Sequence, residues 1–115
     1  MNVTGEIKWH LGEDDYAALK FSESHLAYSI DTVLVPAKFR GQGIGTQLIR
    51  KILLMADTEG KEVYLSARPI GTNDEEKLNR LVHYYERFGF QPIDRGLTVV
   101  YMKRPQHTKH AQPSS

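Results

Sequence analysis

The chain of 115 residues contains no cysteine. Disulfides, thiolate nucleophiles and cysteine-based zinc sites are therefore excluded, and this composition fits a reducing compartment such as the cytoplasm. No stretch approaches the roughly 20 apolar residues that are needed to span a bilayer. The N-terminus also lacks the basic and then apolar pattern of a secretory signal. We therefore expect a cytoplasmic protein that has no membrane partner.

The sequence also has almost no net charge. Its 15 Lys and Arg residues oppose 14 Asp and Glu residues, which leaves a formal charge of +1 and no broad field to attract a nucleic acid. The hydrophobic fraction of 40% and the charged fraction of 25% are typical of a folded protein. At this length one core is expected, because two domains would each bury too little apolar surface. We predict one domain over residues 1–104 and a disordered tail over residues 105–115, which has little to bury.

The tail contains the only pair of histidines that suggests a metal site. His107 and His110 lie three residues apart, but no cysteine or carboxylate accompanies them. A solvated segment explains them better, so we predict no metal.

Residue patterns along the chain predict a mixed fold of strands and helices. β-Branched, aromatic and alternating residues predict strands at 2–9, 15–21, 26–35, 62–67, 90–93 and 97–102. One helix should follow the glycines of residues 41–45 and end at Gly60, and a second should be capped by Asn73 and end at Gly89. A strand, a glycine loop, a helix and a strand in this order predict two parallel strands joined by a crossover. The loop then lies at the carboxyl ends of the strands, where ligands tend to bind.

The loop Arg40-Gly41-Gln42-Gly43-Ile44-Gly45 favours a phosphate ligand. Glycines allow a close backbone approach, and the free N–H groups of the following helix start attract an anion such as a pyrophosphate. A nucleoside-triphosphate loop would need a lysine before its Ser or Thr, and Thr46 has none. The dinucleotide fingerprint needs wider glycine spacing and an acidic residue at the next strand end, which are also missing. The alternative is a tight strand-to-helix turn without a ligand.

Two segments resemble the GNAT superfamily of acyl-CoA N-acyltransferases. Residues 35–45, followed by Leu48, closely resemble its acetyl-CoA motif, whose core is Arg/Gln-x-x-Gly-x-Gly/Ala. Downstream, residues 84–90 (Tyr-Tyr-Glu-Arg-Phe-Gly-Phe) resemble its Leu-Tyr-x-x-x-Gly-Phe helix end. The resemblance covers residues 30 to about 102. It implies an α+β fold with a mixed, mostly antiparallel sheet, whose central parallel pair splays apart to admit pantetheine, and a second helix on the sheet.

The resemblance also implies a binding site for acetyl-CoA. The backbone of Leu34 and Val35 should bind the pantetheine amides, and the pyrophosphate should be cradled by Arg40, Gly41, Gln42, Gly43, Ile44, Gly45 and Thr46. Many relatives have an asparagine seven residues before their helix-end tyrosine. This chain has Leu78 there and Asn79 one place later, about 100° around the helix. The chain therefore departs from the family at this contact.

Two side chains are candidates for catalysis. An alkylamine with a pKa near 10.4 must lose a proton before it attacks a thioester, and a carboxylate could accept that proton. Asp31 stands where many relatives carry a glutamate, although a structural hydrogen bond explains it equally well. Tyr85 matches the family tyrosine whose hydroxyl protonates the departing thiolate, although it also falls on the apolar stripe of its helix. Tyr84 stands where relatives have leucine and is expected to pack.

The short N-terminus affects which acceptors we expect to reach the site. Most family members place a strand and two helices before the segment seen here, and those helices form one wall of the acceptor groove. Without them the acceptor side should be open to a protein surface, or completed by another subunit in a homodimer. The function implied is acetyl transfer from acetyl-CoA to an amine, with a protein lysine or N-terminal amine favoured. The alternatives are a small acceptor (polyamine, amino acid or antibiotic) and a CoA-binding module without catalysis.

Overall fold

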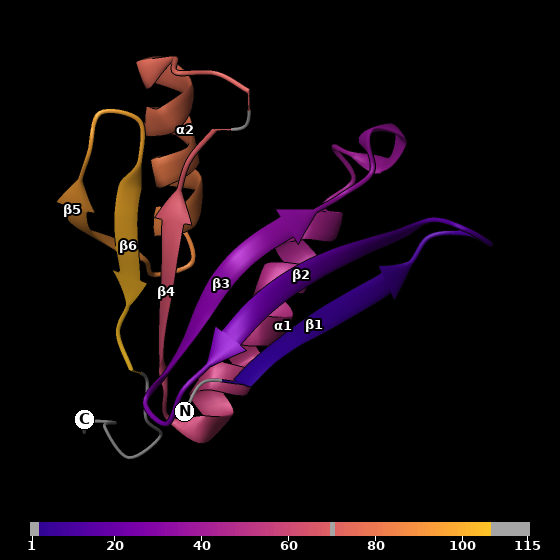
Figure 1. The fold of residues 1–115 in the computed structure, drawn as a ribbon, viewed down its shortest axis with the longest axis horizontal. Coiled ribbons are helices and arrows are strands. Elements are labelled where there is room, and N and C mark those ends of the chain that lie inside the picture. The colour runs from indigo at the N-terminus through magenta and orange to yellow at the C-terminus, as the bar shows by residue number, and fades with distance from the viewer. Residues whose placement is uncertain (1–2, 70, 107–115) are drawn as a thin grey trace.

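The computed structural model describes residues 3–69 and 71–106 (Figure 1). A six-stranded sheet has the order β1-β2-β3-β4-β6-β5, and only its central neighbours β3 and β4 run parallel. The predicted α+β class and the mostly antiparallel sheet are therefore confirmed. The described elements are β1 (Val3–His10), β2 (Tyr16–Glu23), β3 (Ala27–Leu34), η1 (Ala37–Phe39), α1 (Ile44–Glu59), β4 (Glu62–Ala67), α2 (Glu75–Glu86), β5 (Gln91–Arg95) and β6 (Val100–Arg104).

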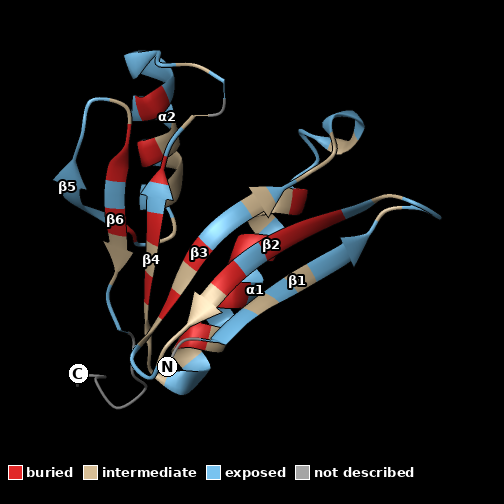
Figure 2. Ribbon diagram, viewed as in Figure 1, coloured by how far each residue is buried: buried red, intermediate tan, exposed pale blue. Residues whose placement is uncertain are grey.

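Both helices cover the same face of the sheet (Figure 1). Along β4 the buried residues Val63, Leu65 and Ala67 alternate with Tyr64 and Ser66, which are not buried (Figure 2). This period of two places alternate side chains on opposite faces of the strand. The core therefore lies between the sheet and the helices, and the opposite face carries no helix within residues 3–69 and 71–106. We call this opposite face the bare face.

The first helix begins and ends as its glycines predict. Gly43 is its N-cap at φ 80°, and Gly60 ends it at φ 68° with its N–H bonded to the carbonyls of Ala56 and Asp57. Residues on its buried side pack into the core, namely Ile44, Leu48, Ile49, Ile52, Leu53 and Ala56. Neither helix of the described residues is long and apolar enough to cross a membrane.

Several predicted boundaries were wrong by one to three residues, since β2 continues to Glu23 instead of residue 21 and α2 ends at Glu86, before Gly89. The side chain of Asp74, not Asn73, caps α2, because its carboxylate accepts the Glu76 N–H at 2.9 Å. A charged acceptor is favoured at the positive end of a helix. The last hairpin turns at residues 96–99 instead of 94–96, because the Gly96 N–H bonds to the Val99 carbonyl at 2.8 Å. Strand β6 therefore runs two residues further toward the C-terminus than predicted.

The parallel strands stay paired over only part of their length. Residues 27–30 of β3 pair with residues 62–65 of β4, and beyond Ile30 the two strands separate. The separation begins at a bulge, because Phe21 of β2 pairs with Ile30 and Lys20 pairs with Thr32, which leaves Asp31 as the extra residue. Bulges of this kind bend a strand and are frequent beside active sites. The edge of β3 that faces β4 is consequently free from Asp31 onward, as the family resemblance implies.

A cluster of polar contacts holds the paired end of these strands. Arg104 of β6 forms a two-pronged contact with Asp57 of α1, at 2.7 and 3.1 Å, and its Nε donates to the Phe88 carbonyl. Nearby, the Tyr28 hydroxyl donates to Glu59 at 2.7 Å. Bidentate pairs of arginine with carboxylate are geometrically specific. They fix β6 and the end of α1 where β3 and β4 are still paired.

Candidate active site

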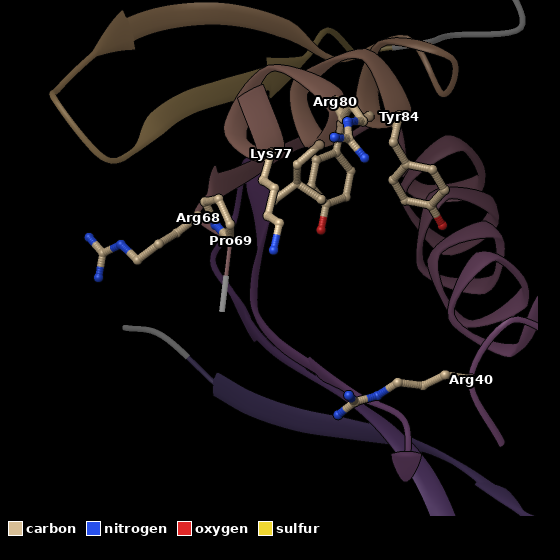
Figure 3. Close-up of a pocket in the computed structure, with 8 residues that line it drawn as sticks. Arg40, Arg68, Pro69, Lys77, Arg80 and Tyr84 are labelled. Atoms are coloured by element: carbon tan, nitrogen blue, oxygen red, sulfur yellow. The ribbon is translucent and has the colours of Figure 1, made fainter. Parts of the chain in front are cut away.

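Two neighbouring cavities lie where β3 and β4 separate. The first, which we call the gap cavity, has a volume of about 340 Å³ and is lined by residues 30–34 of β3 together with Leu65, Ser66, Arg68, Leu81 and Tyr85. The second, the basic cavity, has a volume of about 570 Å³ and is lined by Arg40, Arg68, Pro69, Lys77, Arg80, Leu81, Tyr84 and Tyr85 (Figure 3). Arg68, Leu81 and Tyr85 line both cavities. No carboxylate is among the described residues that line the basic cavity.

The glycine loop presents backbone donors that have no partner in the part of the chain that the structure describes. The first hydrogen bond of α1 runs from the Gln47 N–H to the Gly43 carbonyl, so the N–H groups of residues 43–46 are not used within the helix. The first turn contains no acidic residue. Gly41 and Gly43 have φ of 82° and 80°, values that disfavour other residues. A Cβ at either glycine would meet no atom within 4 Å, so the loop borders open space. This geometry fits a bound phosphate.

The other loop residues contribute in different ways. Arg40 donates from Nε to the Val35 carbonyl at 3.0 Å, which ties the loop back to the end of β3. Its guanidinium lies across the basic cavity from Lys77 (Figure 3). The Ile44 side chain is buried in the core, so only its backbone can face a ligand. Gln42 is exposed.

Tyr85 places a hydroxyl at the junction of the two cavities. Its ring packs edge-to-face against Tyr84 and Phe90, with centroids 5.3 and 5.9 Å away. Its hydroxyl has no hydrogen-bond partner within residues 3–69 and 71–106. Burial, with a smaller contribution from Tyr84, raises the pKa of Tyr85 to about 12. The hydroxyl therefore stays protonated at neutral and moderately alkaline pH, and it is free to donate into the cavity.

Asp31 lies at the bulge of β3 and lines the same gap cavity as Tyr85. Its carboxylate is exposed and accepts a hydrogen bond from the Ser22 hydroxyl at 2.7 Å. The structural hydrogen bond that we set against a catalytic role is therefore present. This bond uses one carboxylate oxygen and leaves the second available to accept a proton. The structure brings Asp31, Leu34 and Tyr85 to one cavity.

Comparison with known proteins identifies the family. A family model described as an acetyltransferase (GNAT) domain matches residues 4–92. The chain belongs to this GNAT family. Comparison with curated proteins gave no match. The family membership confirms the resemblance that the glycine loop and the end of α2 indicated.

Solved structures of GNAT-like fold are similar to the chain. ElaA from Escherichia coli is 25% identical with a TM-score of 0.68, over 88% of this chain and 67% of that one. The anti-CRISPR protein AcrVA5 is 25% identical with a TM-score of 0.60, over 84% of this chain and 97% of that one. Naa50 from Arabidopsis thaliana, in complex with the bisubstrate analogue CoA-Ac-MVNAL, is 25% identical with a TM-score of 0.58, over 76% and 63% respectively.

Three basic residues of the site in this GNAT protein were missed by the sequence analysis. Arg68 follows β4, and Lys77 and Arg80 lie on the exposed side of α2. Lys77, Arg80, Leu81 and Tyr84 have the spacing of one helical stripe, which could have indicated a shared face. The stripe alone does not show that Arg40 lies opposite, because that requires the tertiary fold.

Two further predictions for this GNAT protein concern α2 and the tail. Leu78, at the position of the family asparagine, is buried in the core. Asn79 accepts a hydrogen bond from Arg95 of β5 at 2.8 Å, so it is engaged away from the basic cavity. His107 and His110 lie outside the described residues. Within the described ranges, the side chains form no group of three His, Cys, Asp or Glu that could hold a metal.

Tyr84 does more than pack. Its ring contacts Tyr85 and Phe88, as expected for a packing residue, but its hydroxyl is also hydrogen-bonded to Thr46 Oγ1 at 2.7 Å. This bond joins the end of α2 to the first turn of α1, which are 38 residues apart. Thr46, predicted to face a phosphate, is therefore held by the neighbouring helix.

The variant Tyr84→Phe should be less stable than the wild type by about 1 kcal/mol, because it loses this one hydrogen bond and keeps the ring. Urea denaturation measures the difference. The control is Tyr16→Phe, which removes the hydroxyl of a half-exposed tyrosine in β2 and should leave the midpoint unchanged. Equal midpoints for Tyr84→Phe and wild type would show that the bond between the helices contributes nothing.

Proposed function

We propose that this protein is an N-acetyltransferase that moves the acetyl group of acetyl-CoA to an amine, with an amine on a polypeptide favoured. The observation that carries the proposal is the hydroxyl of Tyr85, which belongs to the lining of the gap cavity and has no hydrogen-bond partner among the described residues. Membership of the GNAT family, the free N–H groups at α1 and the separation of β3 from β4 support it. Naa50 supports a polypeptide acceptor by analogy, because its structure contains CoA-Ac-MVNAL, a bisubstrate analogue that combines CoA with the sequence MVNAL.

We propose that the anionic end of acetyl-CoA binds at the glycine loop. The backbone N–H groups of Gly43, Ile44, Gly45 and Thr46 offer unused donors at the positive end of α1. Gly41 and Gln42 complete the loop, and the guanidinium of Arg40 adds a positive charge. The basic side chains of α2 surround the same cavity and would favour an anionic ligand.

The pantetheine arm would lie along the free edge of β3. An extended chain of amides can pair with an unpaired strand edge as an added strand would. Leu34 lies on that edge, and Val35 follows it. The Val35 carbonyl already accepts from Arg40, so we assign to Val35 the N–H contact. The thioester, which is the reactive group that acetyl-CoA supplies, would then enter the gap cavity beside Tyr85.

In the proposed reaction the amine nitrogen forms a bond to the thioester carbonyl carbon while the bond from that carbon to sulfur breaks. Asp31 accepts the proton that the amine loses, directly or through water, and passes it to solvent. The Tyr85 O–H donates a hydrogen bond to the departing sulfur. Burial raises the pKa of Tyr85 to about 12 and would raise the pKa of a thiol in the same cavity, so the hydroxyl is protonated when the sulfur leaves. The Tyr85 O–H therefore stabilises the departing thiolate and is the candidate acid that protonates it, after which Tyr85 regains a proton from solvent.

The variant Asp31→Asn should lose activity in a way that depends on pH. An amide keeps the shape and the contact with Ser22 but is a much weaker proton acceptor. We expect kcat/KM to fall by about 10²-fold at pH 7 and by much less near pH 10, where more of the amine is already neutral. A pH profile of wild type and variant measures this. A deficit that stays constant from pH 7 to 10 would assign Asp31 a structural role.

The proposed function is tested by acetyl-CoA turnover with a panel of amines. The panel contains a peptide with a lysine, a peptide with a free N-terminus, spermidine and an aminoglycoside. Release of free CoA thiol measures the rate, and mass spectrometry identifies the acetylated product. Binding of acetyl-CoA without transfer to any of these amines would support the alternative of a CoA-binding module without catalysis.

A further inference from the structure

The bare face contains a third cavity at the point where β3 and β4 separate. We call it the outer cavity. It has a volume of about 660 Å³, and its main side chains are Asp31, Tyr64, Ser66, Ile93, Asp94 and Tyr101. Asp31 and Ser66 also line the gap cavity, so the two cavities adjoin. The site therefore opens on both faces of the sheet.

The two openings carry opposite charge. The basic cavity on the helix side is lined by two arginines of the loops and by Lys77 and Arg80 of α2. The outer cavity is lined by the carboxylates of Asp31 and Asp94, and no Lys, Arg or His is among its described residues. The basic cavity thus favours an anion and the outer cavity a cation, and the two ligands would meet in the gap cavity between Asp31 and Tyr85. Two lysines lie close to the outer cavity: Lys20 shares a further cavity with Asp31, and Lys103 is paired with Glu62, which holds Tyr64.

The outer cavity is also lined by aromatic rings. Tyr64 of β4 and Tyr101 of β6 lie on neighbouring strands, and the Tyr64 hydroxyl is held by Glu62 at 2.7 Å. Tyrosine rings bind ammonium groups through their faces, and they pack against the methylene stem of a lysine. Asp94 follows the irregular register at residues 92–94 of β5, and its Oδ1 accepts only the neighbouring Arg95 N–H within the described residues.

The surroundings of the outer cavity favour an acceptor carried on a polypeptide. Ile93 and Tyr101 are 55% and 41% exposed, which leaves apolar surface that a small amine would not cover. Strand β5 forms one edge of the sheet, and all five of its residues are exposed. Such an edge can pair with an extended peptide, whose side chains would then reach neighbouring pockets.

We propose that the outer cavity is the acceptor subsite for a lysine side chain of a polypeptide that lies against β5, with Asp94, Tyr64 and Tyr101 binding the alkylammonium group on its way to Asp31. This proposal rests on the proposed function and adds to it the acceptor group and the residues that select it. Asp94 is a specificity-determining residue here, because it binds the acceptor and takes no part in bond making.

Kinetics with a defined probe test the subsite. The probe is a pool of N-terminally acetylated random peptides, each with one central lysine. We expect wild type to acetylate this pool in preference to spermidine and to peptides with a free N-terminus but no lysine. Asp94→Asn, whose amide oxygen can still accept the Arg95 N–H, should raise KM for the pool about tenfold and leave KM for acetyl-CoA unchanged. The matched control Asp14→Asn, in the exposed turn between β1 and β2, should behave as wild type.

A binding measurement separates failure of the subsite from failure of the function. The tripeptide Ac-Ala-Lys-Ala-amide is titrated into the CoA complex, and amide NMR shifts are recorded. Shifts at residues 93–101 that Asp94→Asn abolishes would support the subsite even if no acetyl transfer occurs. Transfer to lysine with equal KM for Asp94→Asn and Asp14→Asn would overturn the subsite and keep the function. Preference for spermidine or for a free N-terminus would overturn the lysine assignment.

Discussion

Turnover by Tyr85→Phe is expected to fall by about 10²–10³-fold while KM for acetyl-CoA changes little. The variant keeps the ring that packs against Tyr84 and Phe90 and removes only the hydroxyl that faces the gap cavity. The expected loss is that of one preorganised donor to a developing negative charge. Single-turnover kinetics with a confirmed acceptor measure it, because they isolate the chemical step.

The pH profile separates this loss from a loss of stability. Because burial raises the pKa of Tyr85 to about 12, the hydroxyl remains a donor at pH 10, and the deficit of Tyr85→Phe should persist there. The deficit of Asp31→Asn should shrink over the same range. The melting temperature should match that of wild type, since the hydroxyl has no partner within the described residues. If Tyr85→Phe carries out the chemical step at the wild-type rate, Tyr85 has only a packing role.

Replacing Gly43 with valine should abolish the stabilisation of the protein by acetyl-CoA. Gly43 has φ 80° and ψ 11°, a left-handed conformation that is strongly disfavoured for a β-branched residue. A Cβ there meets no atom within 4 Å, so the unbound protein should still fold, at a cost of about 1–2 kcal/mol. The strain should shift the loop and misdirect the N–H groups that follow it.

Thermal denaturation with and without acetyl-CoA measures this effect. At a hundredfold excess over Kd, binding should stabilise wild type by about 2.7 kcal/mol. The control Gly12→Val places the same side chain in the exposed turn after β1, where φ is not positive and no atom lies within 4 Å. The control should keep the full shift. An equal shift in Gly43→Val would remove the glycine loop from the proposed cofactor site.

The parts of the fold that were predicted from the sequence depend on local signals. Gly60 ends α1 because a glycine tolerates the left-handed conformation, and the apolar stripe from Leu48 to Ala56 gives the buried face of the helix. The last hairpin was misplaced because Asp94-Arg95-Gly96 looks like a tight turn, whereas the closing bond runs from Gly96 to Val99. The register of this hairpin is set by the pairing of β5 with β6, and no local sequence pattern indicates that pairing.

The parts of the site that were missed depend on contacts between distant segments. The bond between Thr46 and Tyr84 joins residues 38 positions apart, and a tyrosine that is expected only to pack gives no sign of it. The outer cavity gathers Asp31, Tyr64, Asp94 and Tyr101 from four strands. Their meeting follows from the strand order β3-β4-β6-β5, which the spacing of residues along the chain does not determine.

The incomplete pairing of β3 with β4 divides the molecule into two halves that are joined mainly at one end. One half consists of β1, β2, β3 and α1, and the other of β4, β6, β5 and α2. The paired end joins them and is reinforced by the contact between Arg104 and Asp57. Near the basic cavity, the bond between Thr46 and Tyr84 joins the two halves a second time. A small rotation about the paired end would change the separation of β3 and β4 most at its open end, and the bond between Thr46 and Tyr84 would oppose that change.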